Sequence, residues 1–596
     1  MKFFYGVSFG TGKAEWPQSH RHTKKENMKS GRFFKATACA AAISVQLISA
    51  QTVSSIPPSS PPAGSANTAS SDELQALRDR ITKQEEAIKK LQQSMEEERA
   101  LLEKAMARPA APAGSTTVNT VKVSNGSAGD AAQPVQIVPA VNVSHPHIAW
   151  GRQNLQSKAP SSLSISIGDT TFTPLGFVDA TFFGRSTNVG SGIGTNFGGI
   201  PFNNTSTAHL SETNFSTQNS RIGFRVDSSV LGAKVLGYFE ADFLGQPGGN
   251  IYVTSNADTF RMRNIFVDVQ RNGLEILGGQ DWSMFTPNRR GLSPIPSDIF
   301  YTQNMDTNYQ AGLVWSRQTQ FRFIGHPTEN LAFGVSLENP QQYIGGSGGL
   351  SSTAVTLPAN PAIAAAGGQF DNGNTTYATP NLHPDIIFKA AYDGHVGAND
   401  KIMHVEAGAL IRSFKDTVAV GTPTTYRSSS TTAASGEVNA NLEVIKNFRI
   451  IANTFFGSGG GRYVFGLVPD VIIRPDGTIS PIHTYSTVDG FELNLTKNTL
   501  LDMYYGGVYA GRNVAIDTNG SPIGYGFHGS SNSNNRTIQE GTIGVTQTFW
   551  KSPNYGALSL ITQYSYLTRN PWSVLTGQPK VAKTNMYWVD LRYTLP

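Results

Sequence analysis

The sequence predicts an all-β transmembrane antiparallel β-barrel of about 16 strands, with an N-terminal α-helical coiled coil in front of it. Three observations predict this fold class. From residue 170 to residue 596, segments of about ten residues alternate between apolar and polar side chains, as the strands of a membrane barrel do. The connections between these segments alternate between short and long. Ahead of them, residues 72–107 repeat apolar side chains with heptad spacing.

Residues 1–50 are predicted to be the signal region of an exported chain. Eight of the 47 basic and two of the 42 acidic residues lie there, which leaves 39 basic against 40 acidic residues in the remainder. This near-neutral balance gives no support to a nucleic-acid partner. A basic stretch at 28–35 precedes a short apolar stretch at 36–50, and Ala50 fits a cleavage point. Residues 1–27 fit no signal peptide, so Met28 is a candidate for the true start.

Residues 72–107 are predicted to form the coiled coil, between a Pro/Ser/Ala-rich linker at 51–71 and a Pro/Ala/Ser-rich linker at 108–169. Eight of the ten a and d positions are apolar over more than four heptads. Such a seam is buried only against another copy, so we expect parallel self-association, as a trimer. The alternative is a single solvated helix. The expected oligomerisation residues are Leu74, Leu77, Ile81, Ile88, Leu91, Met95 and Leu102.

The alternation that predicts strands can be followed residue by residue. Met403, Val405 and Ala407 share one parity, whereas His404 and Glu406 share the other, and successive side chains of a strand point to opposite faces. One long segment, 310–325, has room for two strands, and the alternation breaks within 259–271. The predicted strands cover 173–184, 219–228, 233–244, 259–271, 273–282, 310–325, 330–338, 384–393, 402–414, 435–445, 447–456, 488–497, 499–511, 538–550, 556–569 and 583–595.

A closed membrane barrel explains these strands better than the alternative, a secreted β-sandwich. A sheet that spans lipid must close on itself, because an unpaired backbone amide is costly there. Membrane barrels have short turns at one end and long loops at the other. The expected short turns are at 229–232, 446 and 498, and the expected long loops are at 339–383, 415–434, 457–487 and 512–537. Aromatic side chains near the strand ends also fit interfacial girdles, namely Tyr504, Tyr505, Phe549, Trp550, Tyr587 and Tyr593.

Two carboxylates one residue apart, Glu240 and Asp242, have two interpretations. They are either an acid/base pair or the polar face of a strand whose other face, with Phe239, is apolar. In a barrel the polar parity faces the lumen, so we expect both carboxylates to line a pore, opposite an inward track of Arg221, Arg225 and Arg412.

The sequence contains no motif that predicts an enzyme, a cofactor site or a metal site. No HExxH motif occurs, and the eleven histidines show no metal-ligand spacing. His145 and His147 flank a proline in a linker and lack a third ligand. The one cysteine, Cys39, lies in the signal region, so cleavage after Ala50 leaves a chain without thiol chemistry.

The sequence resembles the DcaP-like family of Gram-negative outer-membrane porins. The likeness is carried by four stretches, at 219–245, 261–269, 278–287 and 337–340. It implies a periplasmic coiled coil joined to a barrel, usually as trimers. The chain departs from barrels of this class at its end, because they finish on an aromatic residue and this chain finishes on Pro596.

The resemblance also implies a position for the long segment 283–309. General porins fold a loop into the barrel at this place, which narrows the pore. We therefore expect a constriction that contains Arg289, Arg290, Asp298 and Asp306, with the arginines facing carboxylates of the wall. The alternative is an external loop with solvated arginines.

Two functions follow from these patterns. The first is passive diffusion of small hydrophilic solutes, anions in particular, and the second is a structural anchor that joins the outer membrane to the cell wall through the coiled coil. A sugar channel would need a run of lumenal aromatics, and inward Tyr238, Tyr504 and Trp588 are too few. The expected partners are outer-membrane lipid, two further copies of the chain, the barrel-assembly machinery at the C-terminal strand, and small anions. We expect no cofactor.

Overall fold

The computed structural model describes residues 161–245, 258–344, 355–370, 380–396, 401–465 and 467–596. The chain separates into two units, residues 1–130 and residues 131–596, and all described residues belong to the second. The predicted signal region, the coiled coil with its seam residues, and the linkers as far as residue 160 lie outside the described residues. They stay predictions.

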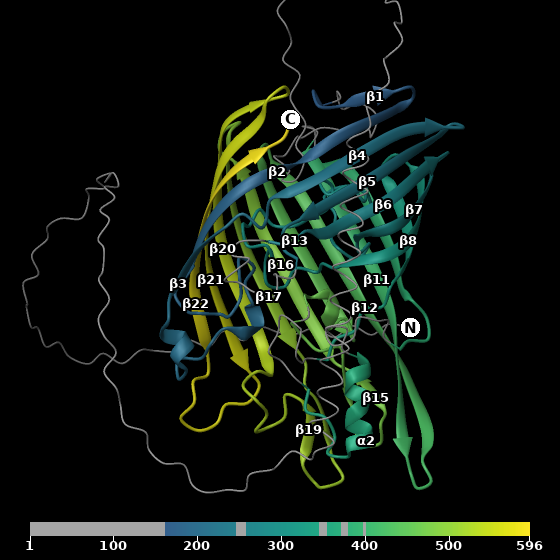
Figure 1. The fold of residues 1–596 in the computed structure, drawn as a ribbon, viewed down its shortest axis with the longest axis vertical. Coiled ribbons are helices and arrows are strands. Elements are labelled where there is room, and N and C mark those ends of the chain that lie inside the picture. The colour runs from purple at the N-terminus through teal and green to yellow at the C-terminus, as the bar shows by residue number, and fades with distance from the viewer. Residues whose placement is uncertain (1–160, 246–257, 345–354, 371–379, 397–400, 466) are drawn as a thin grey trace, which may run out of the picture. The chain divides into compact units, whose positions relative to one another are not determined.

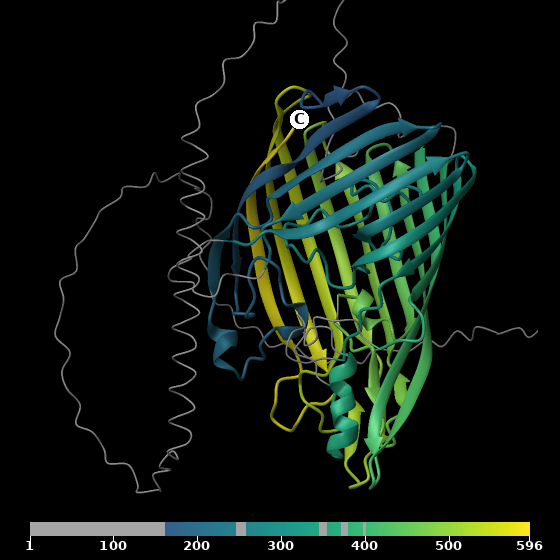
Figure 2. The same ribbon diagram turned by 45° about the vertical axis from the view of Figure 1, so that its right-hand side comes forward.

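The expected barrel of about 16 strands is confirmed. Eighteen strands join in one sheet, of which β1 (Ile165–Ile167) and β3 (Glu212–Ser216) are short additions to β2, and the other 16 form a closed antiparallel ring. Each of the 16 pairs with the next along the chain, and β22 pairs with β2, which closes the barrel (Figures 1 and 2). The 16 strands are β2 (Thr170–Arg185), β4 (Arg221–Val230), β5 (Ala233–Asp242), β6 (Arg261–Arg271), β7 (Leu274–Trp282), β8 (Arg317–Thr328), β9 (Leu331–Glu338), β10 (Asp385–Val396), β11 (Lys401–Val420), β12 (Thr425–Ile445), β13 (Phe448–Ser458), β16 (His483–Asn494), β17 (Thr499–Ala510), β20 (Asn535–Ser552), β21 (Gly556–Pro571) and β22 (Ala582–Thr594).

Short turns join the strands at one end of the barrel, the upper end in Figure 1. Leu231–Gly232 and Asn272–Gly273 are two-residue connections in which all four φ angles are positive, between 51° and 77°. This is the type I′ geometry, whose twist matches that of the flanking strands. The first and last described residues meet at the same end, where the Ser161 hydroxyl donates to the carbonyl oxygen of Pro596 at 2.7 Å.

The long connections gather at the other end of the barrel (Figure 1). Many of their buried apolar side chains pack into one core, which includes Phe197, Leu467 and Ile472. Among the described residues, no helix has the length and apolar character to cross a membrane. The elements within these connections are η1 (Phe197–Gly199), η2 (Ser206–His209), α2 (Pro361–Ala364), η3 (Ala365–Phe370), η4 (Gly461–Tyr463) and the two hairpins β14 (Val471–Ile473) with β15 (Ile479–Pro481) and β18 (Asn513–Ile516) with β19 (Pro522–Tyr525).

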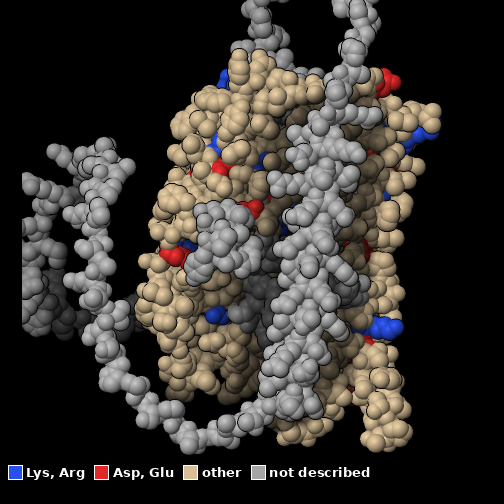
Figure 3. All heavy atoms as spheres, viewed as in Figure 1, with Lys and Arg blue, Asp and Glu red and all other residues tan. Residues whose placement is uncertain are grey.

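The outer wall of the barrel is apolar, whereas the inner wall is polar. Along β8, Phe321 and Phe323 point outward and are 62% and 48% exposed, but Gln320 and Arg322 point inward and are each 2% exposed. Lys, Arg, Asp and Glu take up little of the described surface in the space-filling view (Figure 3). A continuous apolar wall of this kind is unfavourable in water and favourable against lipid hydrocarbon.

A β-bulge at Arg263 explains the break in alternation that the sequence shows in the β6 region. Glu240 of β5 lies opposite Asn264 of β6, but the next residue, Ala241, lies opposite Met262. Arg263 is therefore an extra residue on β6, and its side chain is buried inside the barrel. Past the bulge the alternation resumes with the opposite parity.

The segment 310–325 contains one strand and not two. The strand β8 begins at Arg317, and residues 310–316 are the last part of a connection that lies inside the barrel. Leu313 and Val314 are buried there. These apolar side chains pack within the lumen. In the sequence they resemble the apolar residues of a strand.

Candidate functional site

A long connection between β7 and β8, residues 283–316, runs through the interior of the barrel; we call it the first inserted loop. Its backbone amides donate to side chains of strands that stand far apart around the ring. The Met284 amide donates to Glu338 of β9 at 2.9 Å, and the Ala311 amide donates to Glu540 of β20 at 2.9 Å. Between these points the Asn288 amide donates to Glu406 of β11 at 3.0 Å. The loop therefore crosses the lumen.

Two neighbouring glycines in β17, Gly506 and Gly507, make room for this loop. A Cβ at Gly506 would overlap the carbonyl oxygen of Ala311, so the loop backbone lies directly on the strand. On the loop side, Gly312 has a φ of 94°, and a Cβ there would come within 2.7 Å of the Gly507 carbonyl oxygen. A side chain at Gly506 or at Gly312 would hold the loop away from the wall.

Arg289 of the first inserted loop is paired with a carboxylate of the wall. Its guanidinium donates to both carboxylate oxygens of Glu492 on β16, at 2.6 and 2.9 Å, and to the Tyr301 carbonyl oxygen at 3.1 Å. Tyr504 donates to the same carboxylate at 2.8 Å. Burial alone lowers the pKa of Arg289, but the Glu492 charge more than offsets this and raises it above the ordinary value. The arginine stays charged and its charge is locally neutralised.

The other three residues expected at the constriction have different surroundings. The backbone amides of Arg289 and Arg290 both donate to the Asp298 carbonyl oxygen, at 2.6 and 3.3 Å, which fixes a tight turn in the loop. The Asp306 carboxylate accepts from the backbone amide of Thr195 at 3.1 Å and so joins the loop to the β2–β3 connection. Burial raises the pKa of Asp306.

Glu240 and Asp242 are bound by three arginines of neighbouring strands. Arg263, the bulge residue, donates to Glu240 and to Asp242 at 2.7 Å each. Arg221 pairs with Glu240 at 3.3 Å, and Arg261 pairs with Asp242 at 2.7 Å. Both carboxylates are thus engaged in ion pairs on the inner wall, which disfavours a free acid/base pair.

A fourth arginine stands beside this group with a free donor. The Arg317 guanidinium lies over the Trp282 ring at 5.4 Å, and its Nη1 is buried without a hydrogen-bond partner among the described residues. Arg263 approaches the same ring, at 5.7 Å, and the Tyr309 hydroxyl accepts from Arg221 and Arg263 at 3.4 and 3.3 Å. We call Arg221, Arg261, Arg263, Arg317, Glu240 and Asp242 the arginine cluster.

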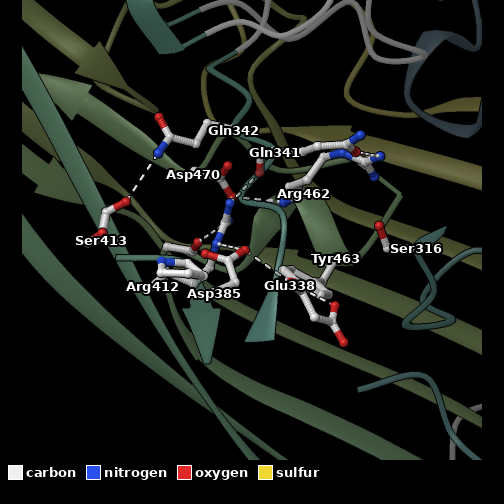
Figure 4. Close-up of polar contacts among 12 residues, drawn as sticks. Ser316, Glu338, Gln341, Gln342, Asp385, Arg412, Ser413, Arg462, Tyr463 and Asp470 are labelled. Atoms are coloured by element: carbon white, nitrogen blue, oxygen red, sulfur yellow. Dashed lines mark hydrogen bonds and ion pairs between the residues drawn. The ribbon is translucent and has the colours of Figure 1, made fainter. Parts of the chain in front are cut away.

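The two remaining arginines of the expected inward track are used within the protein. Arg225 pairs with Asp227 of its own strand at 2.6 Å. Arg412 of β11 donates to Asp385 of β10 at 3.0 Å, to Asp470 at 2.9 Å and to the Gly459 carbonyl oxygen at 2.6 Å (Figure 4). All the expected lining residues therefore lie on the inner wall or in the inserted loop, but the arginines do not form one solvated track.

Aromatic side chains inside the barrel are more numerous than the sequence indicates, because the first inserted loop supplies several of them. The Tyr301 and Tyr309 rings stack at 5.1 Å, and Trp282 packs against both. These rings are almost fully buried and form a core beneath the loop. They pack the loop rather than offer a surface to a sugar.

The sequence alone does not predict several of the interior ion pairs, although most of their residues have the parity of the inner face. Arg263 was hidden by the bulge, and Glu492 stands in an alternating segment whose partner is remote in the chain. Within the described residues, no group of His, Cys, Asp and Glu has the arrangement of a metal site. The further pairs are Arg322 with Asp281, Lys389 with Glu406 and Glu437, and Arg592 with Asp179 and Asp590.

Solved structures similar to this chain include a bacterial outer-membrane channel and porins. The outer membrane channel DcaP of Acinetobacter baumannii matches with a TM-score of 0.49 and 16% identity over 72% of this chain and 98% of that one. This channel bears the name of the family that the sequence resembles. An anion-selective porin from Comamonas acidovorans matches with a TM-score of 0.40 and 13% identity, over 71% and 99% of the two chains.

The OmpF protein of Salmonella typhi, solved with daunomycin, matches with a TM-score of 0.36 and 10% identity, over 72% and 99% of the two chains. No protein-family model and no curated protein sequence matches the chain. At these identities the likeness concerns the barrel fold, which the strand pairing establishes independently.

Proposed function

We propose that the chain is an outer-membrane porin through which small hydrophilic solutes, anions in particular, diffuse passively. The observation that carries this proposal is the closed 16-stranded barrel with an apolar outer wall, a charged inner wall and a loop folded across its lumen. An apolar wall seats the barrel in lipid, and a polar interior offers hydrated solutes a path. A loop that narrows this path limits solutes by size and by charge.

The preference for anions is supported by the arginine cluster. Its four arginines meet two carboxylates, so two positive charges remain in excess. Arg317 also has a buried guanidinium nitrogen that lacks an acceptor among the described residues. Because this nitrogen is buried, the excess charge acts on carboxylate or phosphate solutes by attraction through the lumen and not by direct contact. Arg289 contributes little to this preference, because Glu492 neutralises it.

The assembly and location belong to the same proposal. We place the barrel in the Gram-negative outer membrane as a homotrimer, with the coiled coil in the periplasm. The support is that the described chain begins and ends at the short-turn end of the barrel, which faces the periplasm in proteins of this architecture. The last strand, β22, is then the segment that the barrel-assembly machinery binds.

Single-channel recording in planar bilayers tests the porin, and a salt gradient tests its charge preference. We expect discrete conductance steps and a reversal potential on the anion side. Arg317→Gln should move that potential toward cations, because it removes one of the excess charges. Arg427→Gln is the matched control, since it removes the same charge from an exposed position of the β11–β12 hairpin.

The outcomes separate the alternatives. A cation-side potential that neither variant moves would contradict the preference for anions but leave the porin intact. Absence of conductance steps from the correctly folded wild-type barrel would instead favour the structural anchor, in which the interior is closed.

A further inference from the structure

A second loop also turns into the barrel. The described residues 459–465 and 467–482, between β13 and β16, form the second inserted loop. Several of its apolar side chains are completely buried, including Val464, Leu467 and Val468. Tyr463 and Val464 belong to a core that also contains Phe285 of the first inserted loop and Leu410 of the wall. These contacts with the wall and with the first inserted loop place Tyr463 and Val464 inside the barrel, whereas Leu467 and Val468 belong to the core of the long connections.

The two inserted loops are joined to each other. The backbone amide of Trp315 in the first loop donates to the Tyr463 carbonyl oxygen at 3.0 Å, and Trp315 and Val464 form a parallel β-bridge. The Trp315 ring stacks on Phe465 at 4.7 Å with an interplanar angle of 21°. Displacing the second loop would therefore remove a backbone hydrogen bond and a ring contact from the first loop.

Arg412 holds the second inserted loop to the wall (Figure 4). From β11 its guanidinium reaches Asp470 and the Gly459 carbonyl oxygen of the loop, at 2.9 and 2.6 Å. The same guanidinium donates to Asp385 on β10 and to the Gln341 carbonyl oxygen. One planar group thus fixes two strands and two connections, and its side chain is 1% exposed.

Further polar contacts complete this attachment. The Tyr463 hydroxyl donates to Asp385 at 3.0 Å, and Arg462 donates to the Gln341 side chain at 2.5 Å. The Asp470 carboxylate accepts from the backbone amides of Arg462 and Tyr343, at 2.8 and 2.9 Å. Removing Arg412 would leave two buried carboxylates without their charge partner, which is strongly unfavourable for the closed arrangement.

We propose that Arg412 is a positioning residue that holds the second inserted loop across the lumen, so that the two joined loops together set the size limit for solutes. This inference rests on the proposed porin function and adds a size-determining element to it. Arg412 itself meets protein groups only in the described structure, so its effect on solutes acts through the loop.

Replacing the second inserted loop tests the inference most directly. Ser458 of β13 lies opposite His483 of β16, so an Asn-Gly type I′ turn can join the two strands in place of residues 459–482. We expect single-channel conductance to rise about twofold, because a second obstruction leaves the lumen. Larger neutral sugars should then enter proteoliposomes in swelling assays.

The matched control shortens an extracellular connection that lies outside the lumen. Val420 and Thr425 are partners at the tip of the β11–β12 hairpin, and residues 421–424 between them are exposed. An Asn-Gly turn in their place should leave conductance and size limit unchanged. Folding of every variant is checked by the heat-dependent mobility of the barrel on gels.

Point variants test Arg412 itself and keep the inference falsifiable if the loop replacement does not fold. Arg412→Gln should raise the size limit and make the conductance fluctuate, and Arg412→Lys should restore part of the wild-type behaviour because it keeps a charge for Asp470. Tyr463→Phe removes one contact of the same attachment and should shift the size limit in the same direction, by less.

The result that would overturn the inference is an unchanged conductance and size limit in folded variants that lack the second loop or Arg412. Loss of all conductance from the wild type, with channels appearing only after the loop is replaced, would overturn the open porin but support the obstructing role of the loop. The two proposals can therefore fail separately.

Discussion

A single charge on the outer wall should cost the barrel several times more stability than the same charge on the inner wall. Val267 on β6 is the position of choice, because it is 51% exposed and its cross-strand partners are Gly237 and Gly278. Neither of these two glycines has a side chain that could cover it. Arg271, four residues further on, lies at the short turn, so Val267 stands roughly 10 Å into the membrane if strands rise about 3.3 Å per residue and tilt about 40°.

The magnitude follows from this depth. An arginine on the lipid face near the midplane destabilises a barrel by about 2–4 kcal/mol. We therefore expect Val267→Arg to lower the folding equilibrium constant roughly 30- to 900-fold. The assay is urea-induced unfolding from lipid vesicles, followed by the gel mobility of the folded barrel.

The matched inward substitution is Asn439→Lys on β12. The Asn439 amide donates to Glu406 at 2.9 Å, so an ammonium group there gains a carboxylate partner. We expect a smaller cost than at Val267, because the lumenal face tolerates a charge better than the lipid face does. Equal losses at Val267 and Asn439 would refute the assignment of outer and inner faces.

Three further predictions concern the loops and the N-terminal region. Gly506→Val should lift the first inserted loop from β17, with a cost of about 1–3 kcal/mol and faster proteolysis of the loop, whereas Gly541→Ala should do neither, because nothing lies within 4 Å of its added Cβ. Burial raises the pKa of Asp470 to about 6 in the folded protein, above its ordinary value of 3.8, so this group favours the seated second loop at low pH and loses that contribution as pH rises through about 6. Channels should therefore close more firmly below pH 6, and Asp470→Asn should remove this dependence. A peptide of residues 72–107 should associate at micromolar concentration in sedimentation experiments, and replacing Ile88 and Leu91 with Asp should keep it monomeric.

The strands could be predicted because a barrel wall imposes one simple rule on the sequence. Each strand has a lipid face and an interior face, so its polarity alternates, and every predicted segment overlaps one observed strand. The rule fails where one residue is added, as at Arg263, because a bulge reverses the parity of everything beyond it. It also fails at 310–316, where apolar side chains pack inside the lumen and imitate a strand.

The contacts of the interior could not be predicted from local patterns. Parity places Arg412 on the inner face, but its partner Asp470 is 58 residues away in the sequence, and no local signal pairs them. The sequence predicts the second inserted loop only as a long connection, because a run of aliphatic residues does not indicate which residues it packs against. One signal of the inserted loop is present in β17, where Gly506 and Gly507 lie within a strand. Glycines in a strand often mark the close approach of another backbone.

The interior arginines divide by what they contact, and this division separates charge preference from size limit. The guanidinium of Arg412 donates to groups of the loops and the wall. Its loss should therefore change the size of the solutes that pass and leave the sign of the reversal potential unchanged. Arg317 has a donor that no described residue satisfies, so its loss should change the sign preference with little effect on size. If Arg412→Gln shifted the reversal potential as much as Arg317→Gln does, the loop attachment and the anion-attracting charge would be one site. The distances instead place the guanidinium of Arg412 among carboxylates and carbonyl oxygens of the protein, where its charge is already balanced by Asp385 and Asp470.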